Sequence, residues 1–249
     1  MIIRSKLFIT TLLNLAAFTL LVRAQQTGNT AMPASLGKEA LDYFAKSENG
    51  NLESYLKRIR PVGVSADRRA RLVASIRKED IVSPSFQRQA KLDALRPILI
   101  YHDRAGIEVK VVRLGLAWAG FFEGAAIVVS EEAVDILTAD ELQAVVAHEL
   151  GHEYFAAEYE LARNNKQKDK VKELELKCDG VAIITLSGLG LNPNSLSSAV
   201  SKLTKFNERH GMRNNPALMA SLDERLRFFQ GMTKLAETRV TKPPETARL

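Results

Sequence analysis

The hydrophobic positions between residue 36 and about residue 99 recur at intervals of three and four, which predicts a series of helices. Pro61 and Pro84 separate the helical pieces, because proline lacks a backbone N–H and interrupts a helix. The many Lys and Arg side chains here are expected on solvent-exposed helix faces rather than in a binding patch. Three apolar stripes mark the helices: Leu41, Phe44 and Ala45; Leu52, Tyr55, Leu56 and Ile59; and Leu72, Val73 and Ile76.

The pattern changes at residue 107. Residues 107–111 alternate between apolar and polar side chains, which is typical of a half-buried strand. Two further extended runs are expected at 114–119 and 125–130, separated by a turn that contains Gly120 and Gly124. Together the three runs predict a small antiparallel sheet.

After the sheet the pattern returns to helical spacing, with loops expected at 188–194 and 210–216. The chain therefore predicts one α+β domain, mainly helical, over residues 36–240. Its parts are N-terminal helices over 36–105, a core over 106–240 and a disordered tail over 241–249.

Residues 1–24 have the pattern of a signal peptide. A basic start is followed by an uncharged apolar run over 7–22, and Val22-Arg23-Ala24 places small residues where a signal peptidase reads them. The alternative is a membrane anchor, since the run is close to the length that spans a bilayer. Its Thr and Asn residues and its cleavage-like end favour removal, so export is expected, with a linker over 25–35.

Composition adds three constraints. The formal charge of +6 falls to +3 after cleavage, because three basic residues and no acidic residue leave, and this mild charge argues against a nucleic-acid partner. Cys178 is the only cysteine of the 249 residues, so no internal disulfide can form. The sequence also has no Asn-X-Ser/Thr sequon. These facts favour a bacterial periplasm over a eukaryotic secretory route.

The main chemical signal is a His-Glu-Leu-Gly-His run in the middle of an apolar helix. Thr138 and Glu141 predict a capping box at the start of this helix. His148 and His152 are four residues apart, so both stand on one face and can bind the same metal ion. Glu149 lies about 100° around the helix, where it approaches water rather than the metal. We expect one Zn²⁺ per chain.

A catalytic zinc ion needs a third protein ligand and an open fourth position. The metzincin pattern would require a Gly and a His at positions that hold Phe155 and Glu158. Glu158 lies about 9 Å beyond His152 along a continuing helix, which is too far to share the ion. The third ligand is therefore expected on the next helix.

Glu175 is the favoured third ligand. It lies beside the apolar stripe of its helix, where an unpaired carboxylate would be costly, and Asp179 shares its face. Glu173 is the rival, but Lys177 four residues later suits a surface ion pair. Cys178 is interpreted as a small core residue rather than a ligand.

This combination resembles a known gluzincin family, the HtpX-like heat-shock proteases and CAAX prenyl endopeptidases. That family shows H-E-X-X-H and then E-X-X-X-D on the following helix, as residues 148–152 and 175–179 do here. The likeness covers about 107–229, including the helix entry over 137–142. It also includes Leu116-Ala117-Trp118-Ala119, which takes the place of the family's Asn-Ala-Phe-Ala edge strand.

The resemblance implies a mainly helical, zincin-like metallopeptidase domain with its small sheet beside the metal-binding helix. It implies Glu175 as third ligand, Asp179 as the partner that orients a ligand histidine, and a peptide substrate that pairs with the edge strand. Zinc would acidify water and polarise the scissile carbonyl, while Glu149 acts as general base and then passes the proton to the leaving amine. The partners are then protein or peptide substrates, including unfolded envelope proteins.

The family's membrane-embedded branch has several transmembrane helices. This sequence shows no further span after its signal, so it is similar to the soluble, exported branch and is expected to be periplasmic or secreted.

One position departs from the family pattern. Met219 stands where the family has a His that stabilises the oxyanion, and a thioether cannot donate a hydrogen bond. His210 and Arg225 are the candidate replacements, although the more ordinary interpretations are a helix-end His that bonds carbonyls and a surface Arg in a salt bridge. His102 is interpreted as structural, and Trp118 as a packing residue rather than a substrate contact.

Three hypotheses therefore follow from the sequence. The first is an active exported endopeptidase, which the intact Glu149 favours. The second is a weakly active or inactive zinc-binding member of the same fold, acting as a chaperone-like or adaptor protein, which Met219 favours. The third is a membrane-tethered protease whose signal is never cleaved.

Overall fold

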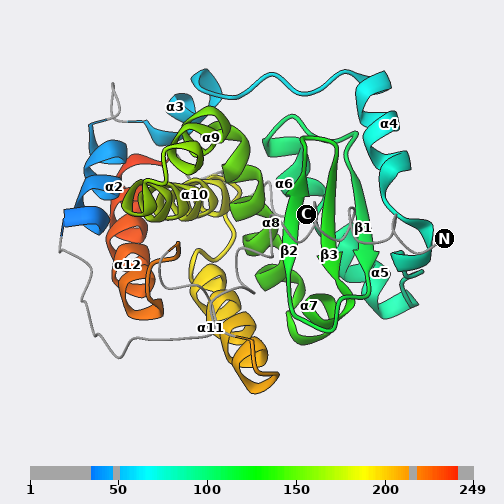
Figure 1. The fold of residues 1–249 in the computed structure, drawn as a ribbon. Coiled ribbons are helices and arrows are strands. Elements are labelled where there is room, and N and C mark those ends of the chain that lie inside the picture. The colour runs from blue at the N-terminus through cyan, green and yellow to red at the C-terminus, as the bar shows by residue number, and fades with distance from the viewer. Residues whose placement is uncertain (1–34, 47–50, 213–217, 241–249) are drawn as a thin grey trace.

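The computed structural model describes residues 35–46, 51–212 and 218–240. The predicted signal peptide, most of the linker and the predicted tail lie outside these residues. Within them the chain is mainly helical, with one small sheet (Figure 1). The prediction of a mainly helical α+β domain is therefore confirmed.

The N-terminal helices follow the predicted apolar stripes. They are α2 (Ser35–Ala45), α3 (Leu52–Arg58), α4 (Ala66–Ser75), α5 (Phe86–Asp93) and α6 (Arg96–Tyr101), with a short 3₁₀ helix over Lys78–Asp80. The three stripes fall on α2, α3 and α4, apart from Ile59 and Ile76, which are the C-cap residues of α3 and α4. Asn51 and Ser65 cap two of these helices, each accepting a bond from a backbone N–H of the first turn.

The core follows as three strands and six helices. These are β1 (Glu108–Val112), β2 (Ala119–Phe122), β3 (Ala126–Ser130), α7 (Glu131–Ile136), α8 (Ala139–Tyr154), α9 (Ala156–Asn164), α10 (Lys168–Gly188), α11 (Asn194–Arg209) and α12 (Leu222–Arg239). The predicted loop before α11 is confirmed, since α10 ends at Gly188 and α11 begins at Asn194.

The sheet is mixed, so the prediction of an antiparallel sheet was wrong. The strand order is β1-β3-β2, with β1 parallel to β3 and β2 antiparallel to β3. The chain leaves β1, forms β2 at the edge and returns as β3 between them. Two successive reversals of direction make the first and third strands parallel. Alternation along each run could not reveal this order, because it reports the face of a strand and not its neighbours.

The middle strand run was also misplaced. Of the predicted run 114–119, only Ala119 belongs to β2, which continues through Gly120 to Phe122. Gly120 pairs with Val128 in the strand, and the Trp118 ring fills the space that a side chain at position 120 would need. The turn is formed instead at Glu123 and Gly124, whose φ angles are 46° and 72°.

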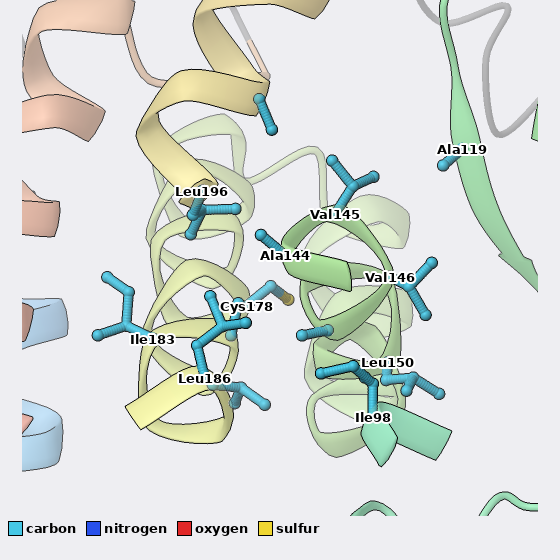
Figure 2. Packing of buried hydrophobic residues seen from close by; sticks show 14 of the residues in the cluster. Ile98, Ala119, Ala144, Val145, Val146, Leu150, Cys178, Ile183, Leu186 and Leu196 are labelled. Atoms are coloured by element: carbon cyan, nitrogen blue, oxygen red, sulfur yellow. The ribbon is translucent and has the colours of Figure 1, made fainter. Parts of the chain in front are cut away.

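Helix α8 lies between β2 of the sheet and α10 (Figure 1). Ten of its sixteen residues are buried, and α10 buries thirteen of twenty-one. Helix α10 packs in turn against α2 and α12, so the two central helices are enclosed on most sides. Figure 2 shows Cys178 of α10 between the two helices. No helix among the described residues is long and apolar enough to cross a bilayer.

His102, at the end of α6, forms hydrogen bonds to α8 and α10. Its side chain is buried, with Nδ1 2.9 Å from the Tyr154 hydroxyl and Nε2 3.0 Å from Thr185 Oγ1. Because the Thr185 hydroxyl donates to Val181 O, the Nε2–H must donate to Thr185 and Nδ1 must accept from Tyr154. Burial lowers the pKa of His102 to about 3. These contacts agree with the structural interpretation of this histidine.

His102 predicts a pH dependence of stability. Its folded pKa lies below the ordinary unfolded value of about 6.5, so the unfolded state binds more protons between these two values and stability falls as pH drops through 6.5. His102→Gln should reduce the difference in unfolding free energy between pH 7 and pH 5 by about 2 kcal/mol. Denaturant titrations at both pH values measure this, with exposed His210→Gln as the matched control. An unchanged pH dependence in His102→Gln would contradict the assignment.

Candidate metal centre

The start of α8 is fixed by the predicted capping box. Thr138 Oγ1 accepts from the Glu141 N–H at 3.2 Å, and Glu141 Oε2 accepts from the Thr138 N–H at 2.8 Å. Glu141 also accepts from Ser198 and Lys202 of α11. The cap therefore sets the register of α8 and ties that helix to α11.

The structure brings the three predicted ligands together. Ligand atoms of His148, His152 and Glu175 all lie within 4.8 Å of one another. His148 is buried, and the other two are partly buried. The rival Glu173 points elsewhere, 2.9 Å from Lys177.

That Glu173–Lys177 pair is not the surface pair that was predicted. The Lys177 side chain is only 5% exposed, and its ammonium lies 4.0 Å from the centre of the Tyr43 ring. The neighbouring α2 covers this side of α10, which helical spacing within α10 alone does not show.

The donor set suits zinc. Two imidazole nitrogens and one carboxylate oxygen are the ligands of several catalytic zinc sites, and such sites keep a fourth position for water. Two ligand atoms of a tetrahedral zinc ion lie about 3.4 Å apart at ordinary bond lengths. His148 Nε2 and Glu175 Oε2 are 3.5 Å apart. The residues therefore fit a zinc ion without a change of fold.

His148 is oriented by its second ring nitrogen. Nδ1 lies 2.8 Å from Asp179 Oδ1, which leaves Nε2 directed at the other ligands. Burial alone would lower the pKa of His148, but the Asp179 carboxylate raises it to about 10. Asp179 thus occupies the position that the family resemblance implies for the orienting partner.

Asp179 is itself held by Arg225. The guanidinium donates from Nε to Oδ2 at 2.9 Å and from Nη2 to Oδ1 at 2.5 Å, and both residues are buried. Ser221 and Glu224 form a second capping box that starts α12 and so places Arg225 in its first turns. Arg225 is therefore salt-bridged, as the alternative interpretation of the sequence held, but it is buried rather than at the surface, and its partner Asp179 was not foreseen.

Cys178 supports the other histidine. Its sulfur lies 3.6 Å from His152 Nδ1, on the side away from the ligand atom Nε2, and the thiol is buried. Burial raises the pKa of Cys178 well above its usual range. Cys178 is therefore a neutral core residue that contacts a ligand, in agreement with its interpretation from the sequence.

Gly151 sets the distance between α8 and α10. A Cβ at this position would lie 2.9 Å from the Cα of Cys178, closer than real Cβ contacts come, and 3.1 Å from its carbonyl oxygen, which is also tight. The glycine lets the two backbones touch where one helix carries His148 and His152 and the other carries Glu175.

Glu149 lies at the edge of the ligand cluster. Its side chain is 14% exposed, and Oε2 is 3.9 Å from His152 Nε2. Burial raises the pKa of Glu149 to about 7.

Helix α8 ends at Tyr154, two residues after the second histidine, instead of continuing as expected. Phe155, with φ −120° and ψ 16°, separates α8 from α9. Glu158 points away from the site, 3.6 Å from Lys170 and 3.9 Å from Lys177, so its exclusion as a ligand agrees with the structure for a different reason. The break instead brings Tyr159 to the site, where its hydroxyl donates to Glu175 Oε1.

In the predicted substrate strand, some backbone N–H and C=O groups already have hydrogen-bond partners within the protein. Trp118 pairs with Ser130 of β3, and the side-chain amide of Asn207 bonds both the N–H and the C=O of Ala117 at 2.9 Å. Leu116 precedes β2, so Ala119 is the only one of the four predicted residues inside the edge strand.

The remaining candidate donor, His210, and the position that departs from the family pattern, Met219, lie at or near the ends of helices. His210 is exposed at the C-cap of α11, where its Nδ1–H donates to Phe206 O at 2.8 Å and its ring stacks on Phe206. Met219 is partly buried just before α12. The residues 213–217 between them lie outside the described structure.

Residues 104–158 match the family model of Peptidase family M48. The match covers the sheet, α7, α8 and His148 to His152, and it ends before Tyr159 and Glu175. Comparison with curated proteins gives no significant match. Over this segment the chain is similar to that peptidase family, and the segment carries two of the three side chains of the candidate metal site, His148 and His152.

Gly151→Ala tests the close approach of α8 and α10. The added methyl group must separate the helices, so we expect a loss of about 1–3 kcal/mol in unfolding free energy and weaker zinc binding. Gly37→Ala in α2, where nothing lies within 4 Å, should be neutral or stabilising. Denaturant titration and chelator competition measure the two quantities. Wild-type zinc affinity in Gly151→Ala would show that the contact does not position the ligands.

Proposed function

We propose that the protein is an exported zinc-dependent endopeptidase that hydrolyses peptide bonds in protein substrates. The observation that carries this proposal is Glu149, a carboxylate beside a cluster of two His and one Glu but outside the ligand set. A zinc site that only stabilises a fold has four protein ligands and needs no base, whereas this arrangement has three ligands and a base.

The reaction divides among the residues as follows. A bound zinc ion supplies the Lewis acid that acidifies water and polarises the scissile carbonyl. Glu149 takes one proton from the water while the oxygen attacks the carbonyl carbon. When the carbon–nitrogen bond breaks, Glu149 gives that proton to the leaving amine. Asp179 and Arg225 keep His148 oriented throughout.

The oxyanion has a weaker donor set than the family pattern provides. Met219 cannot donate, and the Nε and Nη2 groups of Arg225 both donate to Asp179, which makes Arg225 a positioning residue. His210 remains the proposed replacement donor, although its Nδ1–H is bonded to Phe206. Loss of one oxyanion donor commonly costs about a hundredfold in rate, so a slow enzyme is expected.

The substrate is proposed to add to β2 as a further strand. β2 is an edge of the sheet and packs against the helix that carries Glu149. Because Trp118 pairs with Ser130, strand alternation turns the backbone groups of Ala117 and Ala119 away from β3. Asn207 occupies those of Ala117, so the substrate strand pairs from Ala119 onward.

The proposed setting follows from the N-terminal sequence pattern. A cleaved signal at 1–24 would deliver the enzyme to the periplasm or the medium, where unfolded envelope proteins expose the extended segments that an edge strand binds. No nucleic-acid partner and no membrane span of the mature chain are proposed. HtpX-like and CAAX-type enzymes remain the proposed relatives within the M48 family.

A second candidate is a weakly active adaptor or chaperone-like protein of the same fold. Met219 is the specific observation that favours it, because the loss of one oxyanion donor slows hydrolysis. The intact Glu149 favours the peptidase.

Glu149→Gln decides between the two. The amide cannot accept a proton but keeps the size of the side chain, so casein cleavage should fall at least a hundredfold while one zinc per chain is retained. Glu158→Gln, at a half-exposed carboxylate away from the site, is the control and should cleave normally. Equal inactivity of wild type and Glu149→Gln, with zinc bound in both, would exclude the peptidase and leave the adaptor.

Asn207→Ala tests the register of the substrate strand. The change frees the N–H and C=O of Ala117, and two added backbone bonds should lower KM for casein about fivefold or more. Asn192→Ala, which removes an Asn side chain near the opposite end of α11, is the control and should leave KM unchanged. A KM that rises or stays constant in a folded Asn207→Ala protein would show that Asn207 only fastens α11 to the sheet.

A further inference from the structure

We propose that Tyr159 positions Glu175 so that it binds the metal through one oxygen only. The inference rests on the metal centre described above and on the proposed function only for its consequence in catalysis. It concerns a residue that lies outside both the His-Glu-Leu-Gly-His run and the Glu175–Asp179 segment.

The two oxygens of Glu175 have different surroundings. Oε1 accepts a hydrogen bond from the Tyr159 hydroxyl, whereas Oε2 lies 3.5 Å from His148 Nε2 and so faces the other ligands. A carboxylate that accepts a hydrogen bond on one oxygen offers the other oxygen to a metal. The arrangement therefore matches coordination by a single oxygen.

Tyr159 is held firmly in this position. It is 7% exposed, and its ring lies 5.1 Å from the ring of His152 in an edge-to-face contact. The Arg163 guanidinium lies 5.4 Å from the same ring. A buried hydroxyl needs a partner, and Glu175 Oε1 provides it, so the hydroxyl and the carboxylate fix each other.

The break at Phe155 is what allows this contact. Tyr159 is seven residues after His152, so on a straight helix it would share the face of His152 but lie about 10 Å further along the axis. Because α8 ends at Tyr154 and a separate helix, α9, begins at Ala156, Tyr159 lies next to the ligands instead. The interruption at Phe155 thus places Tyr159 against Glu175.

One-oxygen binding has a chemical consequence. Two histidines and one carboxylate oxygen would leave a bound zinc ion a further position for water, whereas binding through both oxygens of Glu175 would add a ligand to it. Tyr159 thus keeps the site in the form that water activation requires.

Each of the three ligands has one neighbouring side chain that contacts the atom facing away from the ligand cluster. Asp179 contacts the outer nitrogen of His148, Cys178 that of His152, and Tyr159 the outer oxygen of Glu175. Of these three, Tyr159 comes from a helix that carries none of the ligands.

The test is zinc affinity of Tyr159→Phe, measured by chelator competition on the full chain. Loss of the hydroxyl should raise the zinc dissociation constant about tenfold or more, as for other partners of metal ligands. In cobalt-loaded protein the visible absorption should weaken, because a carboxylate bound through both oxygens raises the coordination number. Tyr154→Phe is the matched control: it removes the hydroxyl that bonds His102 and should leave zinc affinity unchanged.

A double-mutant cycle separates positioning from a merely structural role. When Glu175→Gln has removed the ligand, adding Tyr159→Phe should change zinc affinity no further, whereas a structural defect would lower it again. Circular dichroism of the metal-free variants checks folding. Wild-type affinity and cobalt spectrum in Tyr159→Phe, or additive losses in the cycle, would overturn the proposal. Neither readout depends on peptidase activity, so an inactive wild type would leave this test intact.

Discussion

The backbone contact between Gly151 and Cys178 is the constraint on which the site depends. Two histidines on one helix can bind an ion only weakly, and the third ligand must come from a second helix at a distance of a few ångströms. A single side-chain carbon at position 151 would prevent that approach, since it would lie 2.9 Å from the Cα of Cys178. The enclosure of both helices by β2, α2 and α12 then keeps the contact closed.

The site also requires that a neighbouring side chain hold each ligand in its orientation. Asp179 and Arg225 form a buried charged pair, and such a pair is costly to bury unless each charge is satisfied. Here the carboxylate is bonded by Arg225 and by His148, so its burial orients a ligand. A substitution of Asp179 would therefore affect both the orientation of His148 and the burial of Arg225.

The parts that the sequence revealed are those encoded by local spacing. The capping box at Thr138, the four-residue interval from His148 to His152 and the apolar face next to Glu175 all lie within one or two helical turns. The contacts that were missed join distant segments. Arg225 is 46 residues from Asp179, and Asn207 is 90 from Ala117. Tyr159 was missed because the helix was assumed to continue through Phe155. The prediction of an antiparallel sheet was wrong for a similar reason, since periodicity does not report which strands are neighbours.

Zinc K-edge X-ray absorption on the purified, zinc-loaded chain tests the central claim most directly. The account predicts only nitrogen and oxygen neighbours at about 2.0–2.2 Å, with outer-shell scattering from two imidazole rings. Sulfur has no place among the neighbours, because the Cys178 thiol contacts His152 from the far side of its ring. A sulfur neighbour at about 2.3 Å, or scattering from fewer than two imidazoles, would contradict a site built from His148, His152 and Glu175.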